Sequence, residues 1–141
     1  MKPFFYFLVP VLIASSAFGE DQAADFLASF VAGHYRLIGQ APEGGATYHG
    51  RVEITRDGTA LEVKRTIAGK TVRGTAAVEN APMAETPVLR LRFKEAGRNY
   101  EGTCLINGDL DNHARLTCHL YRKDGNTRQP GLEALFAVAP K

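Results

Sequence analysis

Apolar and polar side chains alternate along most of this chain after residue 33. A two-residue period places successive side chains on opposite faces of a β-strand. Turn-forming residues, many of them Gly, Asn or Asp, interrupt the alternation at short intervals. We therefore predict seven strands, over residues 34–41, 47–56, 59–67, 71–78, 87–94, 99–106 and 113–123.

Both ends of this alternating region are predicted to be helical. Residues 20–33 carry apolar side chains three and four apart and end in Gly33, which suits the C-terminal end of a helix. We predict a short amphipathic helix there. The segment from Pro130 to Phe136 is predicted to form one helical turn that covers a barrel end or a sheet edge.

Short strands joined by tight turns favour a meander in which each strand pairs with the next. The predicted fold class is all-β, an antiparallel up-and-down meander of about seven strands with a short N-terminal helix. It forms either a barrel or a sandwich. Gly50, Gly74 and Gly102 occupy similar places in three strand motifs. They mark either barrel corners at one height or unrelated points of curvature.

The first residues are typical of a secretory signal. Lys2 precedes an apolar run from Phe4 to Ala14, and small residues follow it. This run of about eleven residues is shorter than the roughly 20 that span a bilayer, which argues against a retained membrane anchor. We predict a signal peptide over 1–19, then a single β-domain over 20–141, periplasmic or secreted, with no membrane contact after signal removal.

The two cysteines, Cys104 and Cys118, are predicted to form a disulfide. A hairpin symmetric about residue 111 places them directly opposite each other on neighbouring strands, within disulfide reach. Export supplies an oxidising compartment. A free, catalytic or metal-binding pair is the alternative.

Composition and motifs exclude several function classes. The 141 residues carry a formal net charge of +2, without the concentrated basic patch of a nucleic-acid binder. Ser29 has no neighbouring His for Ser-His-Asp chemistry, and the four His lack zinc-site spacing. Residues 107–112 alternate oxygen ligands as a calcium loop does, but such residues also form ordinary turns. We expect no enzyme activity, no cofactor and no metal.

One cation falls on a predicted apolar face. In strand 59–67, Arg65 shares its face with three aliphatic residues. Two-residue turns at Asp57-Gly58 and Gly69-Lys70 would place Gly50 and Gly74 on either side of it. A buried Arg needs an internal carboxylate, a ring of carbonyls or an anionic ligand. Otherwise Arg65 lies near the rim and reaches water.

Two tyrosines, Tyr48 and Tyr100, begin strands on the same predicted inner face and form either an aromatic floor or ordinary core. The predicted ligand-binding residues are therefore Arg65, Tyr48, Tyr100, Gly50 and Gly74.

The late hairpins show a resemblance to a known barrel type. Leu89-x-Leu91-x-Phe93, residues 99–104 and Leu116-x-Cys118-x-Leu120 resemble calycin-type barrels, the lipocalin/avidin-like proteins. The resemblance implies a small barrel that binds a small molecule in its mouth. Because the chain has no Trp, the resemblance does not extend to an avidin-like biotin site.

Two functions follow from these observations. The first is an exported, non-enzymatic binding protein that holds a small molecule inside a β-barrel, an anion if Arg65 anchors it. The alternative is a protein-binding module, such as a periplasmic inhibitor of a lysozyme-type enzyme. A ligand binder should leave a pocket around Arg65, whereas an inhibitor should have a filled interior and a protruding ordered loop. The oligomeric state stays open.

Overall fold

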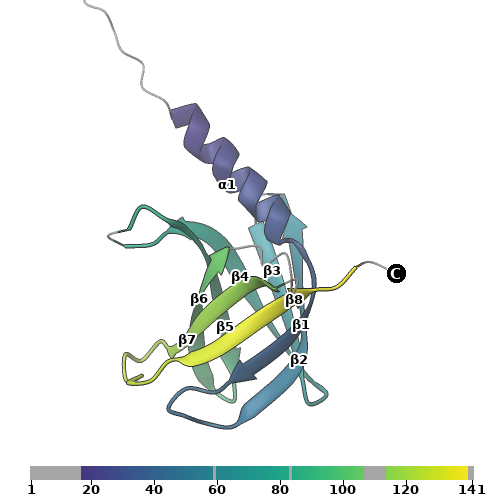
Figure 1. Ribbon diagram of the computed structural model, residues 1–141, viewed down its shortest axis with the longest axis vertical. Coiled ribbons are helices and arrows are strands. Elements are labelled where there is room, and N and C mark those ends of the chain that lie inside the picture. Colours follow the sequence, from purple (N-terminus) through teal and green to yellow (C-terminus); the bar gives the residue numbers. More distant parts are fainter. Residues whose placement is uncertain (1–16, 59, 83, 107–113, 140–141) are drawn as a thin grey trace, which may run out of the picture.

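The computed structural model describes residues 17–58, 60–82, 84–106 and 114–139, which form one helix and a closed eight-stranded barrel (Figure 1). Each strand pairs antiparallel with the next, and the last pairs with the first. The predicted up-and-down meander is confirmed, as a barrel. Its elements are α1 (Ala17–Val31), β1 (Gly33–Gln40), β2 (Thr47–Asp57), β3 (Ala60–Ile67), β4 (Lys70–Asn80), β5 (Pro87–Glu95), β6 (Arg98–Ile106), β7 (Ala114–Arg122) and β8 (Gly131–Ala137).

The helical turn predicted near the C-terminus was wrong. Residues 131–137 instead form β8, which pairs with both β7 and β1. Here the alternation of apolar and polar residues is irregular, because Glu133 and Leu135 are both buried inside the barrel while Leu132 is exposed outside. The segment also contains residues with good helix propensity. Together with the inward carboxylate, they made the two-residue period of the strand unrecognisable in the sequence.

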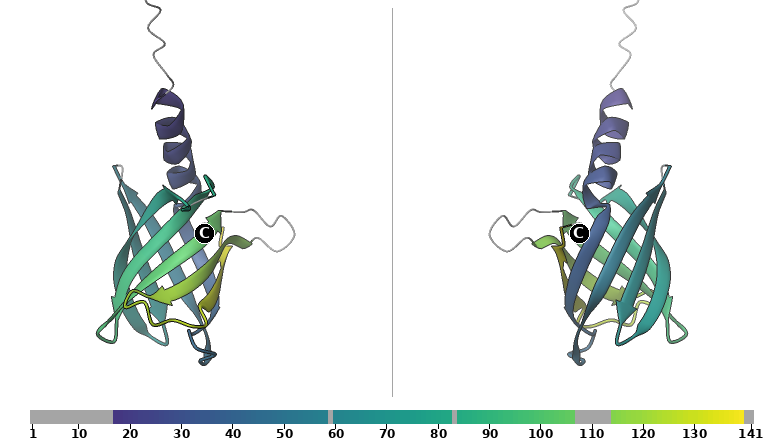
Figure 2. Two further views of the ribbon diagram at one scale, coloured as in Figure 1. Left: turned by 90° about the vertical axis from the view of Figure 1, so that its left-hand side faces the viewer. Right: turned by 90° about the vertical axis from the view of Figure 1, so that its right-hand side faces the viewer.

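Apolar side chains from all eight strands fill the barrel. Val31, the last residue of α1, is also fully buried. The views in Figure 2 show α1 standing at one end of the barrel and pointing away from it, so the rest of the helix is far less covered. Phe26 is 68% exposed. The helix begins three residues before the predicted 20–33 and ends two residues earlier than expected, since Gly33 already belongs to β1.

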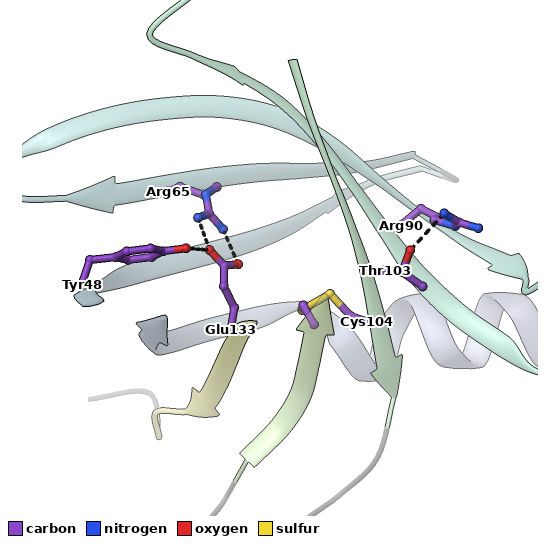
Figure 3. Close-up of a disulfide and its surroundings, with 7 residues drawn as sticks. Tyr48, Arg65, Arg90, Thr103, Cys104 and Glu133 are labelled. Carbon is purple, nitrogen blue, oxygen red and sulfur yellow. Dashed lines mark hydrogen bonds and ion pairs between the residues drawn. A yellow bond between two sulfur atoms is a disulfide. The ribbon is translucent and has the colours of Figure 1, made fainter. Parts of the chain in front are cut away.

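The predicted disulfide is present. Cys104 and Cys118 lie directly opposite each other on β6 and β7 and are bonded (Figure 3). The flanking pairs, Ile106 with Leu116 and Gly102 with Leu120, confirm the symmetric hairpin. The candidate calcium loop at 107–112 lies outside the described residues.

Among the described residues, no helix is both long enough and apolar enough to span a membrane.

Candidate functional site

Arg65 and Glu133 form a buried ion pair inside the barrel. The guanidinium of Arg65 donates from Nη1 to Oε2 of Glu133 at 2.9 Å and from Nη2 to Oε1 at 2.5 Å. The side chains are 2% and 0% exposed. Figure 3 shows them reaching toward each other from β3 and β8. Sequence reasoning gave an internal carboxylate as one of several possible partners of Arg65 but missed Glu133, because the strand that carries it was predicted to be helical.

Aromatic side chains surround this pair. The hydroxyl of Tyr48 donates to Oε1 of Glu133 at 2.5 Å. The guanidinium of Arg65 lies 4.2 Å from the centre of the Phe93 ring, a cation–π contact. Phe93 in turn stacks on Tyr100, with ring centres 5.5 Å apart. The two predicted tyrosines thus both belong to the surroundings of Arg65, Tyr48 through its bond to Glu133 and Tyr100 through its stacking on Phe93.

The surroundings raise the pKa values of Tyr48 and Arg65. Burial raises the pKa of the Tyr48 hydroxyl, and the neighbouring carboxylate of Glu133 raises it further, so Tyr48 stays a donor. Burial by itself would lower the pKa of Arg65. The hydrogen bonds and the negative charge of Glu133 outweigh burial, so the pKa of Arg65 is raised.

The predicted flanking glycines do not flank Arg65. Its neighbours across the sheet are Val52 and Val72, whereas Gly50 pairs with Ile67 and Gly74 with Val63. The turn after β3 is centred one residue earlier than expected, at Ala68-Gly69, with positive φ at both residues. Such a shift moves the pairing by two residues, which keeps every side chain on its predicted face but changes its partners.

Gly50 and Gly74 instead serve close strand packing. A Cβ would lie 2.4 Å from the carbonyl oxygen of Thr66 at Gly50, and 2.3 Å from that of Arg92 at Gly74. At Gly102 the nearest atom would be a Leu91 side-chain carbon at 3.4 Å. The three similar motifs therefore share a sequence pattern but not one structural role.

The interior cation is thus already neutralised by the protein itself. Four hollows, of about 710, 880, 620 and 140 Å³, are lined mainly by outward-facing residues, and Arg65 lines none of these four. Inside the described residues, no three His, Cys, Asp or Glu side chains gather into a metal site.

A second cluster of cations lies on the outer face. Arg36 of β1 and Arg51 of β2 are exposed and directly opposite each other. In the part of the chain that the structure describes, neither makes an ion pair. Like charges facing each other across two strands are destabilising. Sequence reasoning passed over this pair because it searched the inner face for binding residues.

Two adjoining hollows share these arginines. Arg36 and Arg51 line both the 710 Å³ and the 880 Å³ hollow, together with Val138 and Ala139 of the C-terminal segment. Lys64 and Glu53 also line the first hollow, 3.8 Å apart as an ion pair. The negative charge of Glu53 is therefore offset by Lys64. The two arginines leave an excess of positive charge at this hollow.

Two other outward arginines, Arg90 and Arg92 on β5, are neutralised. Arg92 on β5 binds Glu79 through Nη1 at 2.7 Å and Glu101 through Nε at 3.1 Å. Arg90 binds Glu101 at 2.7 Å and donates to Thr103 at 3.0 Å (Figure 3). Arg36 and Arg51 thus differ from the two β5 arginines, which are paired with carboxylates.

Comparison with protein-family models and with curated proteins gives no match. The closed antiparallel barrel is compatible with a calycin-type fold, at the level of architecture.

Proposed function

We propose that this chain is an exported, non-enzymatic binding protein that holds an anionic group on the outside of its barrel, between Arg36 and Arg51. The observation that carries the proposal is the cross-strand pair of arginines at the junction of two hollows. A bound carboxylate or phosphate would relieve their repulsion. Guanidinium groups bind both anions through paired hydrogen bonds.

The interior is a weaker candidate for the same task. An anion at Arg65 would have to displace Glu133, which is bound by two guanidinium nitrogens and by Tyr48. The displaced carboxylate would remain buried beside the ligand, and an unpaired buried charge costs several kcal/mol. The outer arginines carry no such competitor among the described residues.

Arg36→Gln and Arg51→Gln should each weaken anion binding without loss of stability. Removing one of two facing cations should leave the free energy of unfolding unchanged or raise it slightly, by up to about 1 kcal/mol. Amide NMR titrations with butanoate and with inorganic phosphate measure binding to the wild type and to each variant.

Arg73→Gln is the matched control, because Arg73 is an exposed β4 arginine that faces Lys64 and lines neither shared hollow. It should bind both anions as the wild type does. Wild-type binding that is absent, or equal loss in Arg73→Gln, would refute the assignment of the site.

Export has its own test. The mature chain should begin at Phe18 or Glu20, because the small residues before each suit signal cleavage. N-terminal sequencing of the protein from its native compartment gives the answer. A chain that still begins at Met1 would refute removal of the signal.

A protein-binding module is the second candidate, of which a periplasmic inhibitor of a lysozyme-type enzyme is one example. It is favoured by the apolar filling of the barrel and by α1, which points away from the barrel (Figure 2) and whose Phe26 is 68% exposed. Native mass spectrometry of protein from its own compartment separates the two functions. A small added mass supports the anion site, whereas a co-purifying protein supports the module.

A further inference from the structure

The cationic hollow continues into an uncharged surface. The 880 Å³ hollow that contains Arg36 and Arg51 is also lined by Ile38 and Phe136. Ile38 in turn lines the 620 Å³ hollow, which extends over the outer faces of β6, β7 and β8. Glu133 also lines this hollow, but its side chain is buried in the barrel, where it binds Arg65. The two hollows therefore meet at Ile38, with positive charge on one side of it.

Strand register places the apolar part in a straight row. Leu105, Thr117, Ala134 and Ile38 lie directly opposite one another on β6, β7, β8 and β1. Ile38 and Leu105 are 58% and 52% exposed, and Leu132, on the same face, is 51% exposed. Isolated apolar residues are ordinary on a protein surface, but a continuous group of them marks a binding site.

This row carries no charge. On the side of the row away from Arg36, the neighbouring outward positions are Thr103, His119, Leu132 and Gln40, and together with the row they include no Asp, Glu, Lys or Arg. The outer faces of β3 to β5, in contrast, carry the ion pairs of Lys64, Arg90 and Arg92. The uncharged row and the arginine pair are thus two distinct parts of one connected surface.

We infer that the ligand is an amphiphile, with one anionic head group between Arg36 and Arg51 and an apolar chain along Ile38 toward Leu105. This inference rests on the proposed anion site and adds the class of ligand. The charge lies at one end only, and the row extends over three strand spacings, about 14 Å. These dimensions fit an extended alkyl chain. A carboxylate and a phosphate head group share the required chemistry.

Dodecanoate and butanoate test the inference, because they share a head group and differ in chain length. Below its micelle concentration, dodecanoate should bind the wild type at least about tenfold more tightly, since each buried methylene adds favourable transfer energy. The double variant Ile38→Thr/Leu105→Thr should lose this advantage and keep the weak binding of butanoate. Arg36→Gln/Arg51→Gln should lose both. Titration calorimetry measures the affinities, and dodecyl phosphate in place of dodecanoate distinguishes the two head groups.

Tyr121→Thr is the matched control, because Tyr121 is an exposed aromatic on β7 that lies outside the hollows. Threonine suits a strand in every variant. Equal affinity for both anions, lost in the arginine variant, would overturn the amphiphile and leave the anion site intact. Dodecanoate binding that is unchanged in Arg36→Gln/Arg51→Gln would also overturn the amphiphile inference. If neither anion binds and a protein partner is recovered instead, both the anion site and the amphiphilic ligand are refuted.

Discussion

Glu133→Leu should lower the free energy of unfolding by about 3–5 kcal/mol, because it leaves the guanidinium of Arg65 buried without its partner. The hydroxyl of Tyr48 loses its acceptor in the same step. Urea unfolding followed by far-ultraviolet circular dichroism measures the change. Arg65→Met should also destabilise the barrel, since it leaves the Glu133 carboxylate without its cation.

The double variant Arg65→Met/Glu133→Leu should recover most of the lost stability, because it removes both charges and fills their space with apolar atoms. Glu79→Leu is the matched control. It breaks an Arg–carboxylate pair of similar geometry, but Glu79 and Arg92 are 38% and 37% exposed. Its cost should stay within about 1 kcal/mol. Single variants at Arg65 and Glu133 that cost no more than this control would contradict a buried ion pair.

Reduction of the Cys104–Cys118 disulfide should cost about 3 kcal/mol, as expected for a cross-link between residues 14 apart in sequence. The cysteines are buried, at 0% and 3% exposure, and lie deep in the β6–β7 ladder. Urea unfolding of the wild type with and without reductant isolates the cross-link, because the side chains are otherwise the same.

Peptide mapping without reductant provides the control for this measurement. It should give one linked peptide that contains both cysteines. Two free thiols in the native protein, or identical unfolding curves in the two buffers, would contradict the role of the bond.

Strand positions were predictable where local signals agreed. The hairpin of Cys104 and Cys118 has a clear alternation on both sides of its centre, and its register was predicted correctly. After β3, two adjacent turns, Ala68-Gly69 and Gly69-Lys70, both contain Gly69. The observed turn is Ala68-Gly69, with positive φ at both central residues. A one-residue error in the position of a turn leaves each side chain on its predicted face. It changes which residue lies opposite on the neighbouring strand.

The candidate sites were predictable only in part. The inward direction of Arg65 follows from Leu61 and Val63 on the same strand, but the sequence left open whether Arg65 is buried or reaches water at the rim. Its partner, Glu133, is 68 residues away. It belongs to a strand in which this glutamate faces inward and the neighbouring Leu132 faces outward. The facing of Arg36 and Arg51 depends on the register of the first hairpin, which spacing alone leaves open.

The pairing of β1 with β8 also determines when the barrel can form. This ladder joins Tyr35 to Ala137, so closure must wait until residues 131–137 have left the ribosome. Until then, Arg65 has no carboxylate partner and β1 has an unpaired edge. Contacts over such separations slow folding, because loop-closure entropy is lost before they form. The barrel therefore closes only once residues 131–137 are available, and chains in which β8 is not yet paired present an open edge to which other chains can add.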